Sequence, residues 1–201
     1  MTDPTVRLPA QRHVVLRTAG QDDTRALAAA VARHCRRGDV ISLTGELGAG
    51  KTTFVQGAAA ALGVRERVTS PTFMLVRPYR VAHPSEPGHA AAGQSRTDHQ
   101  PSTVVHVDVY RLDQLQDVVE LGEDVIMGSD QVTFVEWGDA VDALLPSDRL
   151  EVELLLGRGD DERDVHLRGY GDWTVRMAEL APELTRWSRG GVTDESPGGV
   201  W

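Results

Sequence analysis

The sequence has almost no cysteine and no long apolar segment. Cys35 is the only cysteine among 201 residues, which excludes a disulfide framework. It lies in an apolar stretch with helical spacing, which favours a small buried side chain over a nucleophile. No stretch approaches the roughly 20 apolar residues of a membrane-spanning helix, and the N-terminus lacks the apolar core of a signal peptide. We therefore expect a soluble, cytoplasmic protein with no membrane contact.

Basic residues are scarce relative to acidic ones. Lys and Arg together number 21 against 30 Asp and Glu, which gives a formal net charge of −9. Affinity for a nucleic-acid backbone comes mainly from Lys and Arg contacts, so this balance argues against a large RNA or DNA footprint on the chain itself. Any RNA would have to be held by a partner.

The length of the chain fits one domain with terminal tails. We predict a flexible N-terminal tail over residues 1–12, the domain over residues 13–187 and a flexible C-terminal tail over residues 188–201. Within the domain, residues 82–102 are rich in Pro, Gly, Ser, His and Ala and have no apolar periodicity. This composition predicts a flexible inserted loop.

Lysine occurs once, and every other Lys or Arg position is arginine. Lys51 lies in the segment GELGAGKT, which fits the phosphate-binding pattern G-x-x-x-x-G-K-[S/T] at every fixed position. A compact ammonium suits a ring of backbone amides better than a guanidinium does. The alternative is a plain glycine turn that caps a helix.

The pattern predicts that backbone N–H groups and the N-terminus of the following helix bind polyphosphate. Lys51 would reach the β- and γ-phosphates, and the Thr52 hydroxyl would bind Mg²⁺. The predicted nucleotide-binding residues of this loop are Gly45, Glu46, Leu47, Gly48, Ala49, Gly50, Lys51, Thr52 and Thr53.

The segments around the loop alternate between strand and helix patterns. Residues 40–44 predict a buried strand before it, and residues 53–62 an alanine-rich helix closed by Gly63. The other predicted strands are 14–16, 72–79, 104–108, 132–136 and a hairpin of 150–156 with 164–168, and the other predicted helices are 24–37, ended by Gly38, and 114–121. We therefore expect an α/β fold, a three-layer P-loop NTPase-like domain with a mixed β-sheet.

Two of the predicted strands end in an acidic residue. Asp108 and Glu136 each follow an apolar run, so each carboxylate is expected at the edge where open α/β sheets bind ligands. One would hold Mg²⁺ and the other would orient or deprotonate a water, and the pattern leaves the two roles open. Taken singly, either acid is typical of a strand-end turn. His106 faces the same side of its strand as Asp108, and a hydrogen-bonded histidine is favoured there over a transition-metal ligand.

Four ordered blocks resemble the bacterial TsaE family, also called YjeE. They are GELGAGKTT at 45–53, SPTF at 70–73, HVDVYRL at 106–112 and EW at 136–137. The resemblance covers about residues 14–170, and the last two blocks are more specific than a P-loop alone. It implies a Mg-dependent P-loop ATPase that supports synthesis of threonylcarbamoyladenosine at position 37 of certain tRNAs, with ATP and Mg²⁺ as cofactors.

The resemblance also implies roles for single residues. Lys51, Asp108 and Glu136 would be catalytic. Thr52 and Glu136 would bind Mg²⁺, Asp108 would act on the attacking water, and Thr72 would sense the γ-phosphate of ATP.

Partners follow from the same resemblance. The family works with the threonylcarbamoyl transferase TsaD and its inactive paralogue TsaB, so we expect a TsaD–TsaB-like complex, and tRNA only through it. P-loop proteins without an arginine in place hydrolyse at roughly 10⁻⁴ to 10⁻² per second, and a supplied arginine adds about 10³ to 10⁵. The expectation is slow turnover alone, with Arg77, Arg80 and Arg111 as candidate internal donors. Trp137 would lie beside the nucleotide, at a partner surface or at the edge of the core.

Three other functions also use a P-loop. A small-molecule kinase needs an acceptor pocket and usually an arginine-bearing lid. A GTPase is disfavoured, because no N-K-x-D motif can occur in a chain whose only lysine is Lys51. A nucleotide-dependent interaction module would position partners through its binding state and not through turnover.

Overall fold

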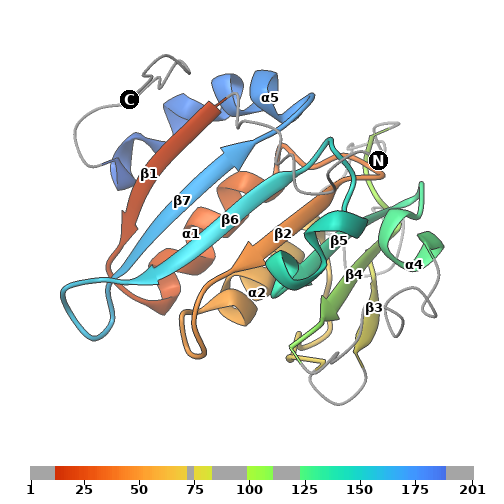
Figure 1. Ribbon diagram of the computed structural model, residues 1–201, viewed down its shortest axis with the longest axis horizontal. Helices are drawn as coiled ribbons and strands as arrows, with labels where there is room; N and C mark the ends of the chain where they lie inside the picture. The colour runs from red at the N-terminus through yellow and green to blue at the C-terminus, as the bar shows by residue number, and fades with distance from the viewer. Residues whose placement is uncertain (1–11, 72–74, 83–98, 111–122, 189–201) are drawn as a thin grey trace, which may run out of the picture.

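The structure is a computed structural model that describes residues 12–71, 75–82, 99–110 and 123–188 (Figure 1). Almost all of the predicted tails at 1–12 and 188–201, and most of the predicted insertion at 82–102, lie outside these residues. The predicted helix at 114–121 also lies outside them. These expectations therefore stay predictions.

A seven-stranded mixed sheet forms the centre of the molecule, in the order β1-β7-β6-β2-β5-β4-β3. The strands are β1 Arg12–Thr18, β2 Val40–Thr44, β3 Val76–Arg80, β4 Thr103–Asp108, β5 Gln131–Glu136, β6 Leu150–Leu156 and β7 Arg163–Gly169. The four central strands β6, β2, β5 and β4 pair in parallel, whereas β1, β7 and β3 join antiparallel. The mixed sheet and the β6–β7 hairpin confirm the prediction.

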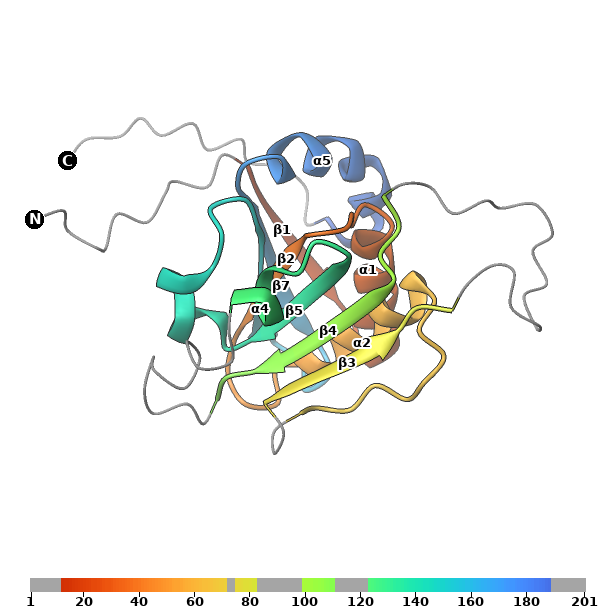
Figure 2. The ribbon, with the colours of Figure 1, turned by 90° about the vertical axis from the view of Figure 1, so that its right-hand side faces the viewer.

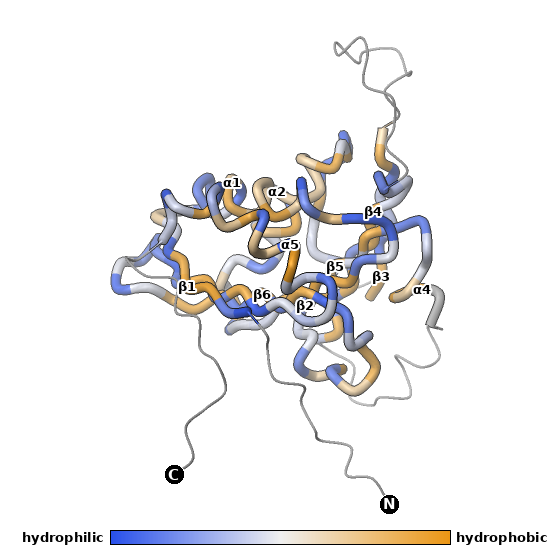
Figure 3. Tube along the Cα trace, turned by 90° about the horizontal axis from the view of Figure 1, so that it is seen from above, coloured by the Kyte–Doolittle hydropathy of each residue, from blue (hydrophilic) through white to orange (hydrophobic). Residues whose placement is uncertain are grey.

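Helices cover both faces of the sheet and complete the three layers (Figures 2 and 3). On one face lie α1 Gln21–Ala32, α2 Lys51–Leu62, α5 Trp173–Leu180 and the 3₁₀ segment η2 Ala181–Trp187, which share a single apolar core with the sheet. On the other face, α4 Glu123–Met127 and the 3₁₀ segment η1 Gly138–Leu144 cover part of β2, β4 and β5. The three-layer α/β expectation is confirmed.

The boundaries of α1 differ from the prediction. The helix begins at Gln21 and ends at Ala32, not at residue 37. Past its end the Asp39 carboxylate accepts the Arg36 N–H at 2.7 Å and pairs with Arg176 from α5. These contacts hold the segment in a turn, so the helix cannot continue to Gly38.

Cys35 lies in this turn and is buried, as predicted. Its thiol donates to the Val31 carbonyl, with sulfur and oxygen 3.8 Å apart, and burial raises the pKa of the thiol well above its ordinary value. A thiol with a raised pKa is a poor nucleophile. Cys35 therefore contributes to packing.

The other predicted elements need smaller corrections. β1 is longer than residues 14–16, β3 is described only from Val76 to Arg80, and α2 begins at Lys51 instead of residue 53. Gly63 ends α2 as predicted. The sequence did not predict α4, η1, α5 or η2.

The register of the central strands places the two acids side by side. Asp108 and Glu136 are the last residues of β4 and β5 and pair directly across the two strands. The neighbouring strand β2 ends at Thr44 and runs into the glycine-rich loop before α2. The sheet thus delivers two carboxylates to the edge where α2 begins.

Candidate functional site

The glycine-rich loop bends tightly against β6. Gly45 has φ +130°, and a side-chain Cβ there would lie 2.2 Å from the Leu154 carbonyl oxygen. Ala49 is fully buried in the core beneath the loop, whereas Leu47 is 79% exposed at its tip. The loop is therefore anchored at its base and open at its tip, with Lys51 as the first residue of α2.

Lys51 is almost fully buried at the start of α2. Its Nζ donates to the Gly45 carbonyl at 2.6 Å and to the Glu46 carbonyl at 3.0 Å, and lies 3.7 Å from the centroid of the Trp137 ring. Burial lowers the pKa of the ammonium, and the nearby carboxylates, Glu136 first, partly oppose that shift. The ammonium is thus held beside the loop by neutral acceptors, which an anion can replace.

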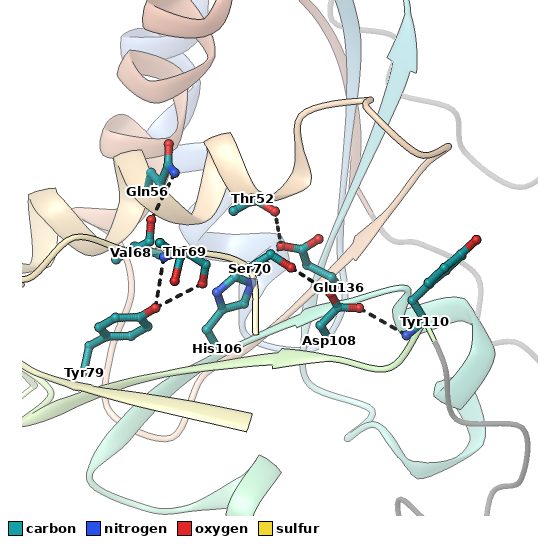
Figure 4. A network of polar contacts seen from close by, with 10 residues as sticks. All are labelled: Thr52, Gln56, Val68, Thr69, Ser70, Tyr79, His106, Asp108, Tyr110 and Glu136. Atoms are coloured by element: carbon teal, nitrogen blue, oxygen red, sulfur yellow. Dashed lines mark hydrogen bonds and ion pairs between the residues drawn. The ribbon is translucent and has the colours of Figure 1, made fainter. Parts of the chain in front are cut away.

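Thr52 is linked to the acid that ends β5 (Figure 4). The Thr52 hydroxyl donates to Glu136 Oε1 at 2.7 Å, and the same oxygen lies 2.7 Å from His106 Nε2. Because a carboxylate only accepts hydrogen bonds, the imidazole nitrogen is the donor. His106 is hydrogen bonded, as the sequence favoured.

The acid that ends β4 faces a different set of donors. Asp108 Oδ2 accepts the Ser70 hydroxyl at 2.9 Å, and Oδ1 accepts the Tyr110 backbone N–H at 3.2 Å. Both acids are buried, with exposed fractions of 5% for Asp108 and 4% for Glu136. Two neighbouring carboxylates therefore have separate hydrogen-bond partners, which orient them independently.

These residues meet in one pocket of about 580 Å³. Its lining comes from the loop, the start of α2, the ends of β4 and β5, and the segment before β3. The lining residues are Leu47, Gly48, Gly50, Lys51, Thr52, Thr53, Ser70, Asp108, Tyr110, Glu136 and Trp137. Of the residues predicted in the loop, Gly45, Glu46 and Ala49 are not among the lining residues.

The oxygen atoms of the pocket fit magnesium. Mg²⁺ is a hard cation that takes oxygen ligands, commonly one or two carboxylates with waters and substrate phosphates. Thr52 Oγ1 and the Glu136 carboxylate lie together, and Asp108 is paired across the strands from Glu136. The described residues contain no cluster of three or more His, Cys, Asp or Glu side chains with metal-site geometry. Protein oxygens would therefore supply only part of the coordination of a bound ion.

Two aromatic residues form the rim of the pocket. The rings of Tyr110 and Trp137 lie 4.7 Å apart between centroids. Trp137 has φ +61°, a left-handed backbone that is uncommon for a bulky residue. This conformation directs the indole over the Lys51 ammonium. Trp137 is therefore a pocket residue, and not only part of the core edge.

Two of the predicted residues are outside the described part of the chain, and two others, Arg77 and Arg80, do not line the pocket. Thr72 and the candidate donor Arg111 are outside the described residues. The Arg77 guanidinium donates to Thr69 Oγ1 at 2.8 Å and lies over the Tyr79 ring.

The sequence analysis missed Arg163, the first residue of β7. Its Nε donates to the Ala49 carbonyl at 3.0 Å, and Nη2 donates to the Gly48 carbonyl at 3.2 Å. A cation hydrogen bonded to a peptide carbonyl polarises that peptide group, so the N–H of the same group becomes a better donor. Arg163 thereby supports the loop from outside the pocket. It is one of many arginines, and no motif marks it.

The fold and the site define the class of the protein. A mixed α/β sheet with a glycine-rich loop between β2 and α2, and acids at the ends of β4 and β5, is a P-loop NTPase-like architecture. The family profile described as "Threonylcarbamoyl adenosine biosynthesis protein TsaE" matches residues 18–165. The chain belongs to the TsaE family.

Individual relatives agree with this assignment. The Bacillus subtilis tRNA threonylcarbamoyladenosine biosynthesis protein TsaE is 33% identical, with 85% of this chain and 92% of that protein covered. The Streptomyces coelicolor protein of the same name is 41% identical, with 78% and 99% covered. The crystal structure of Bacillus subtilis YdiB superposes with a TM-score of 0.63 at 29% identity, and covers 86% of this chain and 96% of that one. Within the described residues, no helix combines the length and apolar character needed to cross a bilayer.

Proposed function

We propose that this protein binds Mg-ATP in the pocket at the start of α2 and hydrolyses it to support threonylcarbamoyladenosine modification of tRNA. Its target would be a transferase complex of the TsaD–TsaB kind. One observation carries the proposal: Lys51, Thr52 and the two strand-end carboxylates line a single pocket. Membership of a family named for threonylcarbamoyladenosine biosynthesis supports the pathway.

The phosphates would lie against the loop amides and the N-terminus of α2, where the helix dipole favours negative charge. On binding, Lys51 would exchange the carbonyls of Gly45 and Glu46 for phosphate oxygens. Glu46 is exposed and Gly45 is partly exposed, so water can solvate these carbonyls after the exchange. The burial that lowers the pKa of Lys51 also strengthens its attraction for an anion, because the medium is less polarisable than water.

Thr52 and Glu136 are the residues that would hold Mg²⁺. The Thr52 oxygen can offer a lone pair to the cation while its hydroxyl keeps donating its hydrogen bond to Glu136 Oε1. Bound Mg²⁺ would neutralise charge on the β- and γ-phosphates. Glu136 would contact the ion directly or through a water.

Asp108 is then left to act on the water that attacks the γ-phosphate. Its two oxygens are oriented by Ser70 and by the Tyr110 N–H, and Ser70 opens the segment that leads to Thr72. A carboxylate held this way can accept a proton from water as the new P–O bond forms. Its neighbour Glu136 is already engaged by two other donors.

Slow turnover by the isolated chain is part of the proposal. None of the described residues that line the pocket is an arginine. An arginine supplied by a partner typically accelerates P-loop hydrolysis by about 10³ to 10⁵. We therefore assign acceleration to the transferase complex, with hydrolysis resetting that complex between modification cycles.

The test is the ATPase rate of the full chain alone, with the transferase pair, and with the pair plus tRNA. We expect slow release of phosphate alone and a large increase with the pair. Turnover of many ATP molecules per second by the isolated chain would remove the partner dependence. Asp108→Ala should abolish both hydrolysis and tRNA modification; modification that persists without hydrolysis would instead favour the nucleotide-dependent interaction module.

A further inference from the structure

His106 is a fully buried polar side chain whose position has no packing explanation. It lies on β4 opposite Phe134 of β5, two pairs before the Asp108–Glu136 pair and therefore on the same face of the sheet. Its neighbours on this face, Val104, Val132 and Phe134, are apolar and fully buried. An aliphatic side chain would suit such a site better than an imidazole.

Only one of the two imidazole nitrogens of His106 is bonded. Nε2 lies 2.7 Å from Glu136 Oε1, whereas Nδ1 is buried without a hydrogen-bond partner in the described part of the chain. A buried polar atom without a partner costs stability. A residue that carries this cost without a packing benefit is expected to serve the site it contacts.

The contact with His106 restricts the Glu136 side chain. A glutamate has three side-chain torsions, and one hydrogen bond leaves the carboxylate free to swing about the bonded oxygen. Here Oε1 receives the Thr52 hydroxyl from α2 and the imidazole N–H from β4, two donors on different elements. The other oxygen, Oε2, has no hydrogen-bond donor among the described residues. Figure 4 shows the three side chains converging in this way.

We propose that His106 is a positioning residue for the magnesium site: its Nε2–H fixes Glu136 Oε1 beside Thr52 and leaves Oε2 for the ion or its water. A hydrogen bond to a metal-binding carboxylate orients that carboxylate and influences the affinity for the metal. The inference rests on the proposed function, because it assumes that a Mg-nucleotide occupies the pocket. It assigns no role to His106 in contact with substrate.

The test compares two substitutions of similar size. His106→Gln places an amide N–H close to where the imidazole Nε2–H lies and has no equivalent of the unpartnered Nδ1. His106→Leu has neither nitrogen. Two quantities are measured on the full chain: ATP affinity by calorimetry over a series of Mg²⁺ concentrations, and the melting temperature without ligand.

For His106→Leu we expect the half-saturating Mg²⁺ concentration to rise by about 10- to 100-fold. ATP affinity without Mg²⁺ should stay near the parent value, and the ligand-free melting temperature should be equal or higher, because the unpartnered nitrogen is gone. His106→Gln should keep a Mg²⁺ dependence close to that of the parent. A residue with a merely structural role would lower the melting temperature instead and leave the Mg²⁺ dependence unchanged.

Each other outcome decides against the proposal. If the parent needs Mg²⁺ for tight ATP binding and His106→Leu needs no more of it, the positioning role is wrong and the proposed function stands. If ATP binding by the parent does not depend on Mg²⁺, both the positioning role of His106 and the proposed function are wrong. If His106→Leu does not fold, His106→Asn replaces it, because the Asn amide reaches the position of Nδ1 but not that of Nε2. Equal Mg²⁺ dependence of the Asn and Gln variants would then refute the positioning role of His106.

Discussion

Replacing Gly45, the first glycine of the loop, tests whether the loop is anchored on β6. In Gly45→Ala, the new Cβ would lie 2.2 Å from the Leu154 carbonyl oxygen, where a normal contact needs roughly 3.5 Å. The carbonyl cannot retreat easily, because Leu154 is fully buried and lies in a strand paired with β2 on one side and β7 on the other. The loop must therefore move.

Two costs add for Gly45→Ala. A positive φ costs an alanine about 1–2 kcal/mol. Overpacking against a fixed neighbour costs about 1–3 kcal/mol more. Gly48→Ala is the matched control, since Gly48 has φ +81° in the same loop but nothing within 4 Å of a Cβ. The control should show only the first cost, so the two variants should differ by about 1–3 kcal/mol.

Thermal and urea unfolding of the ligand-free chain measure this difference. For a domain of this size each kcal/mol corresponds to about 2–4 °C in melting temperature. Gly45→Ala should melt clearly below Gly48→Ala. It should also lack the rise in melting temperature that we expect Mg-ATP to give the parent. If the two variants melted at the same temperature, the close approach of the loop to Leu154 would be wrong.

Three further changes follow from the contacts of the pocket. Lys51→Met should fold and lack the rise in melting temperature expected with Mg-ATP. The pKa of Lys51 is lower in the folded chain than its ordinary 10.5, so between these two values the unfolded chain binds more protons. The ligand-free parent should therefore gain stability relative to the variant as pH rises toward 10.5. Asp108→Asn should retain Mg-ATP binding by calorimetry while phosphate release falls by about 10²- to 10⁴-fold; loss of binding would argue against a role confined to the water. A lysine at position 163 cannot donate to both loop carbonyls in the fork geometry of Arg163, so Arg163→Lys should weaken ATP binding. The control Arg158→Lys, at an exposed turn position, should not. Equal ATP affinities of the two variants would exclude support of the loop by Arg163.

The loop and the acids were predictable because local patterns specify them. An apolar run that ends at Thr44, a glycine pattern and an alanine-rich helix closed by Gly63 each depend on neighbouring residues only. The apolar runs before Asp108 and Glu136 likewise specify buried strands. Since these strands are parallel, their acidic ends had to meet at one edge of the sheet.

Features that depend on distant residues were not predictable. The apolar pattern of α1 continues past Ala32, but the helix stops there because Asp39 is paired with Arg176, 137 positions further along the chain. The support of the loop by Arg163 depends on β7 lying next to β6 and not on any spacing within the sequence. Short 3₁₀ segments such as η1 carry too few residues for a periodic pattern.

The structure adds a physical reason for dividing the roles of the two acids, which the sequence pattern had left open. Glu136 shares its Oε1 with the Thr52 hydroxyl, and a P-loop hydroxyl that donates to an acid presents its lone pair to the cation site. Asp108 is instead bonded to Ser70, on the segment before β3. Under the proposed function, a carboxylate tied to the helix that would bind the phosphates suits the metal. Because Asp108 is held by a segment other than α2, we propose that it is the acid available to the attacking water.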